Sequence, residues 1–318
     1  MSNRTAVTEF LLLGFSDIRE LQILHFVVFL VICLAALMGK LLIVMAVALD
    51  RHLHTPMYFF LMNLAILDLG SIFVILPKSM VNSLMNTRLI SYPGCVAQVF
   101  LFVVFIVTEI AFLTVMAYDR YVAICQPLHY KRVMNWRACI HMAAGPWISG
   151  IVYSALHIGN TFRLPFCQSN VINQFFCEIP QLLKFICSDS YLSEVGFIAF
   201  GVFIAANCFV FIIVSYVQIF KTVQRIPSEQ GLHKAFSTCL PHLIIVTMFL
   251  SIFSFAYLKP TSSSTSGLDL FVAVLYSMVP PVTNPIIYSM RNKDIKNAVK
   301  KMIGWRLFTK NKRTVFLP

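Results

Sequence analysis

A few ionisable side chains interrupt the long apolar stretches of this sequence, and their chemistry is the first feature to explain. Asp119 and Arg120 stand side by side, and the twenty residues before them are nearly all apolar. An Arg in such surroundings is costly unless it is paired, and a change of its partner between two conformations would make it a switch. The simpler interpretation is an ion pair that marks a helix end, with Arg120 reaching toward water.

Lys40, Asp68 and Glu109 are further charges inside apolar runs. A lone Lys in a lipid bilayer costs about 2.5–3.5 kcal/mol, so Lys40 is expected to face neighbouring helices and to pair with an acid. Buried carboxylates also occur in transporters and channels, which keeps that class of function open. Catalysis is not indicated, because the eight histidines lack metal-ligand spacing and there is no Gly-rich loop of the kind that holds phosphates. We therefore expect neither an enzyme nor a cofactor.

Composition indicates the solvent that surrounds these charges. Of the 318 residues, 58% are hydrophobic and 12% are charged, whereas a soluble domain carries about 25% charged residues. Seven runs reach the length of about 20 mostly apolar residues that a bilayer span requires. They cover roughly 23–49, 57–80, 96–122, 138–158, 194–220, 237–258 and 269–290. Because irregular backbone in lipid leaves polar groups unpaired, these runs predict an all-α integral membrane protein, a seven-transmembrane helix bundle.

Basic residues predict the orientation of this bundle. The connections on one side hold seventeen Lys and Arg residues, and those on the other side hold seven. The richer side should face the cytosol, which makes residues 1–22 extracellular and residues 291–318 cytoplasmic. Asn3 begins a glycosylation tripeptide, which is used only on the outer side. The net charge of +12 could suggest nucleic acid, but the apolar runs make membrane lipid the partner of the basic residues.

Four cysteines fall in segments predicted to lie outside the cell, where disulfides persist. They are Cys95, Cys167, Cys177 and Cys187, and the last three belong to the long connection between the fourth and fifth runs. A connection of that length is usually functional or disordered, and its cysteines favour a folded lid. Four cysteines allow three pairings, which the residues alone do not distinguish.

Five motifs in the expected order match one known family. The stretch "MAYDRYVAIC" resembles the inner end of helix three in rhodopsin-like G-protein-coupled receptors, in its olfactory form. "NPIIY" is similar to the motif that closes helix seven, and "LHTPMYFFLMNLAILD", "SY" and "KAFSTC" look like further odorant-receptor signatures. The five motifs occupy 116–125, 284–288, 53–68, 215–216 and 234–239. The similarity runs from "TEFLLLGF" to "RNKDIKNAVKK", so the chain resembles an olfactory receptor over nearly its whole length.

The resemblance implies an odorant receptor in the plasma membrane that activates a stimulatory heterotrimeric G protein and raises cyclic AMP. In this family the Arg that matches Arg120 is held by its neighbouring acid at rest and is released toward the G protein on activation. Such a change is a ligand-driven shift between two packings. The switch residues that the resemblance assigns are Asp119, Arg120, Tyr121, Tyr216, Asn284, Pro285 and Tyr288.

The resemblance also implies the cysteine pairing and the place of the ligand. It selects Cys95–Cys177, which ties the lid to helix three, and Cys167–Cys187 within the loop. Receptors of this type bind their ligand just beneath the lid, where uncharged side chains of three spans converge. An apolar pocket with a few hydroxyl groups suits a small volatile molecule, although ordinary helix packing would use the same residues. The residues are Phe102, Val103, Ile106, Val107, Phe200, Ile204, Phe253, Ser254 and Tyr257.

Lys40 is the most informative departure from the family, whose members carry Asn at this position. That Asn bonds the acid that matches Asp68, and relatives use this acid with the one that matches Glu109 to hold a sodium ion. We expect the Lys40 ammonium to sit against Asp68 as a tethered cation that competes with sodium. The alternatives are that Lys40 snorkels inward or weakens folding. Leu250 stands where most relatives carry Tyr, so a polar contact that this Tyr usually makes is absent.

The segment after the seventh run has helical spacing of apolar residues. Ile295, Ala298, Val299 and Met302 share one face, which predicts a short amphipathic helix on the inner leaflet rather than a disordered basic tail.

Two other functions stay open. One is a related receptor for a non-odorant metabolite outside the nose. The other is a transporter, a class that commonly shows internal repeats, which this sequence lacks.

Overall fold

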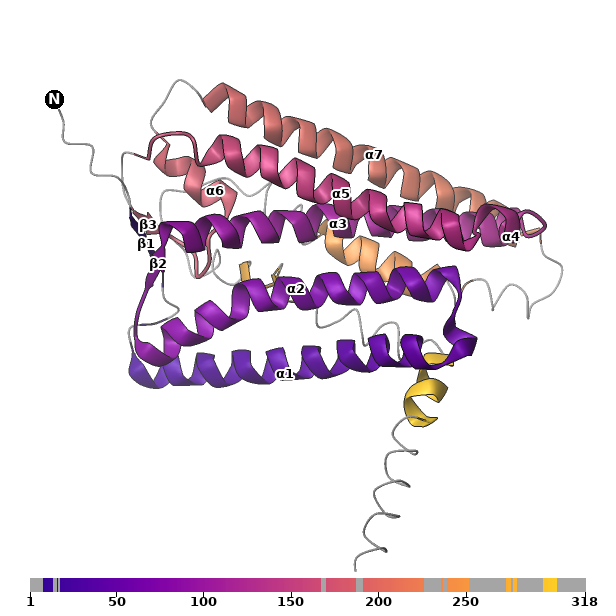
Figure 1. Ribbon diagram of the computed structural model, residues 1–318, viewed down its shortest axis with the longest axis horizontal. Helices are drawn as coiled ribbons and strands as arrows, with labels where there is room; N and C mark the ends of the chain where they lie inside the picture. The colour runs from indigo at the N-terminus through magenta and orange to yellow at the C-terminus, as the bar shows by residue number, and fades with distance from the viewer. Residues whose placement is uncertain are drawn as a thin grey trace, which may run out of the picture.

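Long helices that run the length of the molecule make up most of the structure (Figure 1). The computed structural model describes residues 8–13, 16, 18–166, 170–186, 191–225, 236, 239–251, 273–275, 277–278 and 294–301. Within these residues, five helices are long and apolar enough to cross a membrane, and each contains one of the first five predicted spans. They are α1 (Arg19–Leu49), α2 (Pro56–Met85), α3 (Tyr92–Cys125), α5 (Trp136–Thr161) and α7 (Tyr191–Val223). The shorter helices are η1 (Arg51–Leu53), α4 (Tyr130–Val133), α6 (Ile179–Leu182) and η2 (Leu183–Phe185).

The sixth and seventh predicted spans lie partly outside the described residues. Residues 239–251 of the sixth span are helical, as are residues 273–275 and 277–278 of the seventh. A further helix at 294–301 buries Ile295 and Ala298 against the bundle, whereas Lys296 and Lys300 are exposed. This helix has one apolar and one basic face, the pattern that suits the surface of a membrane.

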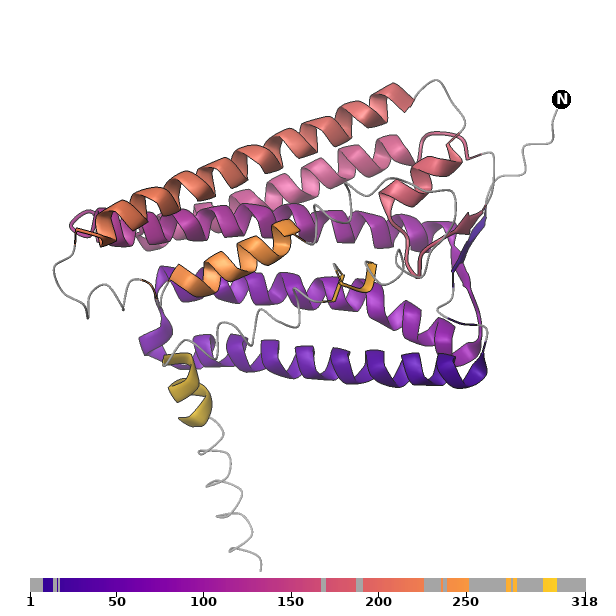
Figure 2. The same ribbon diagram turned by 180° about the vertical axis from the view of Figure 1, so that it is seen from behind.

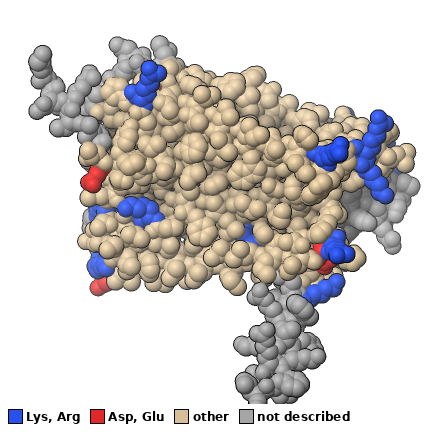
Figure 3. Space-filling view, viewed as in Figure 1, with Lys and Arg blue, Asp and Glu red and all other residues tan. Residues whose placement is uncertain are grey.

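The outer surface of the bundle is apolar along most of its length. In the most apolar stretch of α7 only 6% of the residues are buried, and side chains such as Phe203 and Ile213 are 63% and 58% exposed. The Lys, Arg, Asp and Glu side chains on the face in Figure 3 lie mostly toward the two ends of the bundle. In water such a surface would drive association, whereas lipid tails are as apolar as Leu. The molecule is therefore a helical integral membrane protein.

A small sheet at one end of the bundle is not predicted by the sequence. Strand β1 (Glu9–Leu12) lies between β2 (Leu89–Ser91), to which it is antiparallel, and β3 (Val171–Ile172), to which it is parallel. Alternate side chains of β1 point inward, since Phe10 and Leu12 are buried and Glu9 is exposed. The sheet joins the N-terminal segment to the start of α3 and to the α5–α7 connection (Figure 2). We call this the sheet end, and the opposite end, where α3 finishes, the Arg120 end.

Gly150 lets α5 approach α3 closely. A Cβ atom at position 150 would meet the hydroxyl oxygen of Thr108 and would lie 3.1 Å from the carbonyl oxygen of Val104. Thr108 is fully buried and its hydroxyl donates to the carbonyl of Pro146 at 3.3 Å, so it has little freedom to move aside. Gly145 on the same helix has open space at the corresponding position among the described residues.

We expect Gly150→Ala to lower the thermal stability of the purified protein, because overpacking a close contact costs about 1–3 kcal/mol. Gly145→Ala is the matched control and should leave stability unchanged or raise it by up to about 1 kcal/mol, since Gly is unfavourable inside a helix. Thermal unfolding in one detergent measures both variants. Equal melting temperatures would contradict the close contact of α3 with α5.

Candidate functional site

The Arg120 end of α3 holds a buried ion pair. Nε of Arg120 donates to Oδ2 of Asp119 at 2.9 Å, and a terminal guanidinium nitrogen contacts the same oxygen. The Asp119 side chain is 1% exposed and that of Arg120 is 12% exposed. The arginine therefore lies against its neighbouring acid and does not extend into water as a snorkelling helix-end residue would.

Tyr130 of α4 makes a second contact with the same acid. Its hydroxyl donates to Oδ1 of Asp119 at 2.8 Å. Burial and the adjacent Asp119 carboxylate raise the pKa of Tyr130, so its phenol stays protonated and remains a donor at neutral pH. The sequence analysis missed Tyr130, whose signal is an aromatic hydroxyl in the short connection after the Asp–Arg pair.

A buried histidine joins three helical segments near this end. The Tyr216 hydroxyl of α7 lies 2.7 Å from Nδ1 of His242, and Nε2 of His242 lies 3.0 Å from the Leu113 carbonyl oxygen of α3. Because a carbonyl only accepts, Nε2 must carry a proton, and Nδ1 of the neutral ring then accepts from Tyr216. His242 was also missed, and its signal is a polar side chain within an apolar run. Tyr121 of α3 is half-buried and packs against the apolar cluster that includes Leu113 and Met116.

A second buried ion pair joins α1 to α2. Nζ of Lys40 contacts Oδ2 of Asp68, and the two side chains are 2% and 1% exposed. Glu109 of α3 is close enough to add an electrostatic attraction for Lys40. Lys40 therefore faces the bundle and does not snorkel toward water. Among the described residues, no group of three or more His, Cys, Asp or Glu side chains forms a metal site.

We call the connection between α5 and α7 the lid; its described residues are 162–166 and 170–186. The lid is anchored to α3. A disulfide joins Cys95 of α3 to Cys177 of the lid. Beside it, the backbone N–H of Cys177 donates to Oε1 of Gln98 at 2.8 Å, and Nε2 of Gln98 donates to the Val74 carbonyl of α2 at 2.9 Å. One disulfide and one buried amide thus fix the lid to two helices. Gln98 was not singled out from the sequence.

An apolar cluster lies directly beneath the lid. Phe102 of α3 packs edge-on against Phe176 of the lid, with ring centres 5.4 Å apart. Ile106 of α3, together with Ala273 and Met278 of the seventh span, joins the same cluster. The structure therefore brings together the sheet-end half of α3, the lid and the described residues of the seventh span. Val103 packs in the neighbouring cluster around the disulfide, and Val107 is half-buried.

Phe200 and Ile204 of α7 lie apart from this cluster, contrary to the expectation that they converge with α3. Their side chains are 56% and 45% exposed, and the Phe200 ring packs against Tyr153 of α5 at 6.4 Å. Because α7 is apolar on all sides, its sequence does not reveal which face turns inward.

Other predicted residues lie outside the described part of the chain. They are Asn3, Cys167, Cys187, Phe253, Ser254, Tyr257, Asn284, Pro285 and Tyr288.

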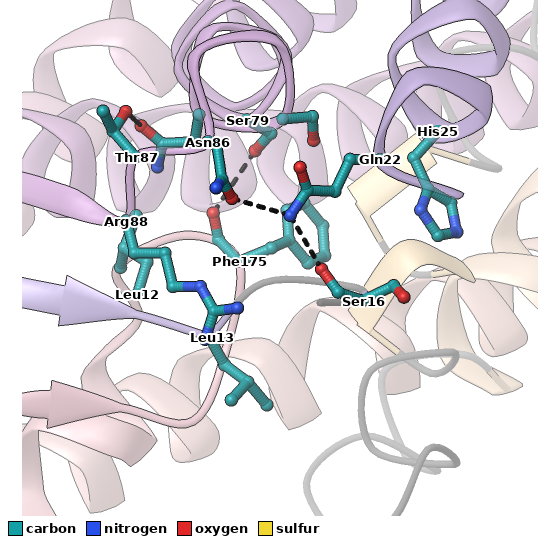
Figure 4. A pocket seen from close by; sticks show the side chains of 12 residues that line it. Leu12, Leu13, Ser16, Gln22, His25, Ser79, Asn86, Thr87, Arg88 and Phe175 are labelled. Carbon is teal, nitrogen blue, oxygen red and sulfur yellow. Dashed lines mark hydrogen bonds between the residues drawn. The ribbon is translucent and has the colours of Figure 1, made fainter. Parts of the chain in front are cut away.

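A small polar pocket lies beside the lid, between β1, α1 and α2 (Figure 4). Nε2 of Gln22 donates to the Ser16 carbonyl at 3.1 Å and to Oδ1 of Asn86 at 2.7 Å. The Ser79 hydroxyl donates to the Phe175 carbonyl at 3.3 Å. The pocket volume is about 30 Å³, whereas sites for small molecules span about 300–1,000 Å³. We interpret this pocket as an anchor for the N-terminal segment and the lid, not as the ligand site.

The apolar helices, with a covered apolar cluster at one end and a buried charged pair at the other, are consistent with a helical bundle like that of G-protein-coupled receptors. The chain belongs to the olfactory receptor family, because the family model described as "Olfactory receptor" matches residues 28–306. Olfactory receptor 14C36 of Homo sapiens is 51% identical over 311 residues, which cover 98% of this chain and 100% of the relative. Olfactory receptor 14I1 of the same species is 52% identical over 310 residues, 98% of each chain. The family identified from the motifs is thus confirmed, and the protein is a receptor rather than an enzyme.

We expect Cys177→Ser to reduce both thermal stability and the amount of receptor at the cell surface. Losing a disulfide typically costs about 2–5 kcal/mol, which is a large part of a total stability of about 5–15 kcal/mol. Cys208→Ser is the control, since Cys208 of α7 is a free, half-buried cysteine. Wild-type surface staining and an unchanged melting temperature for Cys177→Ser would show that the lid does not depend on this bond.

Proposed function

We propose that this receptor detects a small, mostly apolar volatile odorant and activates a stimulatory heterotrimeric G protein, which raises cyclic AMP. The observation that carries the proposal is the buried Asp119–Arg120 pair at the end opposite the lid. An arginine held by a single neighbouring carboxylate can be released when the packing changes, and it then offers a positive charge to a protein partner. The Lys and Arg excess at this end supports a cytoplasmic C-terminus and an extracellular N-terminus in the plasma membrane.

The odorant binds beneath the lid in this proposal. The aromatic rings of Phe102 and Phe176 and the aliphatic side chain of Ile106 offer apolar contacts there. Val103 and Val107 lie on the adjacent face of α3, Val103 against the cluster around the disulfide. Such a surface suits a weakly polar ligand, whose affinity comes mainly from burying apolar area.

Activation has to loosen the Arg120 end. The helical segment 239–251 is held to α3 and α7 by the two hydrogen bonds of His242, to the Leu113 carbonyl and to Tyr216. A typical hydrogen bond contributes about 0.5–1.5 kcal/mol net. A ligand that binds more tightly to one of two packings can supply the free energy needed to break both hydrogen bonds.

Arg120→Ala tests the proposal. We expect this variant to reach the cell surface but to give no cyclic AMP response to any odorant that activates the wild type in a broad panel. Arg137→Ala, which removes an exposed arginine at the start of α5, is the control and should signal normally. A normal response of Arg120→Ala would exclude the switch role, and a panel without any active compound would argue against odorant detection.

Lys40 takes the place of a bound cation between α1, α2 and α3. A sodium ion at this position would need the carboxylates of Asp68 and Glu109 as ligands, but Asp68 is already paired with the Lys40 ammonium. The residues present therefore do not fit a free sodium ion. The tethered ammonium neutralises Asp68 and attracts Glu109 without an exchangeable ligand.

The melting temperature as a function of sodium concentration, with choline replacing sodium at constant ionic strength, tests the role of Lys40. We expect no sodium dependence in the wild type. Lys40→Asn should melt at higher temperature as sodium increases, because two carboxylates then lack their tethered cation. Adding Asp68→Asn to Lys40→Asn should abolish this dependence. The same sodium dependence in the wild type and in Lys40→Asn would rule out the tethered cation.

A further inference from the structure

A groove between α7 and the helical segment 239–251 lies toward the Arg120 end, away from the proposed odorant site. Its volume is about 650 Å³. The side chains that line it are mostly apolar, including Val217 and Phe220 from α7 and Leu243 and Leu250 from the facing segment. A hollow of this size and polarity can hold a molecule with a long hydrocarbon part.

The groove is open on the side that faces the surrounding membrane. Val217 and Phe220 on its rim are 46% and 47% exposed, whereas Tyr216 and Cys239 on its inner wall are 9% and 4% exposed. A ligand therefore reaches this groove sideways from the bilayer, because the protein core closes the other side.

The length of the groove matches one leaflet of a bilayer. Its wall on the α7 side runs from Ile212 to Gln224, just past the end of the helix, which is about 18 Å at a rise of about 1.5 Å per residue. The hydrocarbon core of a membrane is about 30 Å thick, so one leaflet is about 15 Å deep. An extended acyl chain follows such a groove from the membrane surface to the midplane, whereas a compact ligand would fill only part of it.

Positive charge marks the end of the groove that lies nearest the membrane surface. Lys221 lines the groove, and Arg225 follows about one helical turn later, just beyond the end of α7 at Val223. Both side chains are exposed. The acidic residue in the sequence of α7, Glu194, belongs to its first turn at the other end of the helix.

We propose that this groove binds an anionic phospholipid, with one acyl chain along the apolar walls and the phosphate against Lys221 and Arg225. The inference rests on the membrane-spanning arrangement and is independent of the odorant and of the G protein. Each Lys or Arg near an anionic headgroup is worth about fivefold in binding. The bound chain also contacts Tyr216, the residue that hydrogen-bonds His242.

Photolabelling in nanodiscs tests the proposal. The probe is phosphatidylserine with a photoreactive diazirine in its acyl chain, diluted into phosphatidylcholine, and mass spectrometry locates the labelled residues. We expect labels within residues 212–224 and 239–250, and severalfold weaker labelling by the matching phosphatidylcholine probe. Equal labelling by the two probes would mean ordinary surrounding lipid and would overturn the proposal.

Two sets of variants separate the chain site from the headgroup site. Val217→Trp fills the groove and should abolish labelling, whereas Val210→Trp, at a 59% exposed position of α7 outside the groove, should not. The pair Lys221→Gln and Arg225→Gln should reduce labelling by phosphatidylserine to the level of phosphatidylcholine. If Val217→Trp does not fold, the charge variants at two exposed positions decide the question. Phosphatidylserine labelling that stays at the wild-type level after either change overturns the proposal.

Discussion

A charge that leaves water must find its counter-charge within the protein, and the packing of this bundle depends on that constraint. Lys40 and Asp68 connect α1 to α2, and Asp119 holds Arg120 on α3. At the sheet end, Nε2 of His157 on α5 lies 3.0 Å from Oε2 of Glu194 on α7, and the two form an ion pair when the histidine is protonated. Removing one partner of a buried pair costs about 3–5 kcal/mol. Apolar contacts between helices are non-directional. A buried pair that joins two helices therefore fixes how each helix is rotated and how far it is shifted along its axis.

The two ends of the bundle are held together by contacts of different strength. At the sheet end, a disulfide, a three-stranded sheet and the Gln98 amide connect the lid to α2 and α3. At the Arg120 end, hydrogen bonds connect the segments, among them one from Tyr130 and two at His242. A rearrangement of the packing therefore costs less free energy at the Arg120 end than at the sheet end. A ligand held beneath the rigid end can have its main effect on structure at the opposite end, which is the behaviour expected of a receptor.

The helices were predictable from the sequence, because the lack of charge over about 20 residues is a strong signal. Lys40, Asp68, Asp119 and Arg120 were also visible in the sequence, since each is a charged residue in or at the end of an apolar run. The rotation of α7 was not predictable. Its lipid-facing and protein-facing side chains are equally apolar, so Phe200 and Ile204 gave no sign of their exposure. His242 acquires its partners through contacts between segments that are distant in the sequence, and Tyr130 meets Asp119 because the connection after α3 folds back; a single sequence reveals neither.

The position of β1 has a consequence for the order in which the protein is assembled. This strand is synthesised before its partners, because β2 follows α2 and β3 follows α5 in the chain. Its pairing with β2 must wait until α1 and α2 have been made, and its pairing with β3 must wait until four long helices have been made and the lid has folded. A strand made before the long helices is thus completed late, and a nascent receptor exposes an incompletely paired apolar strand until the lid has been synthesised.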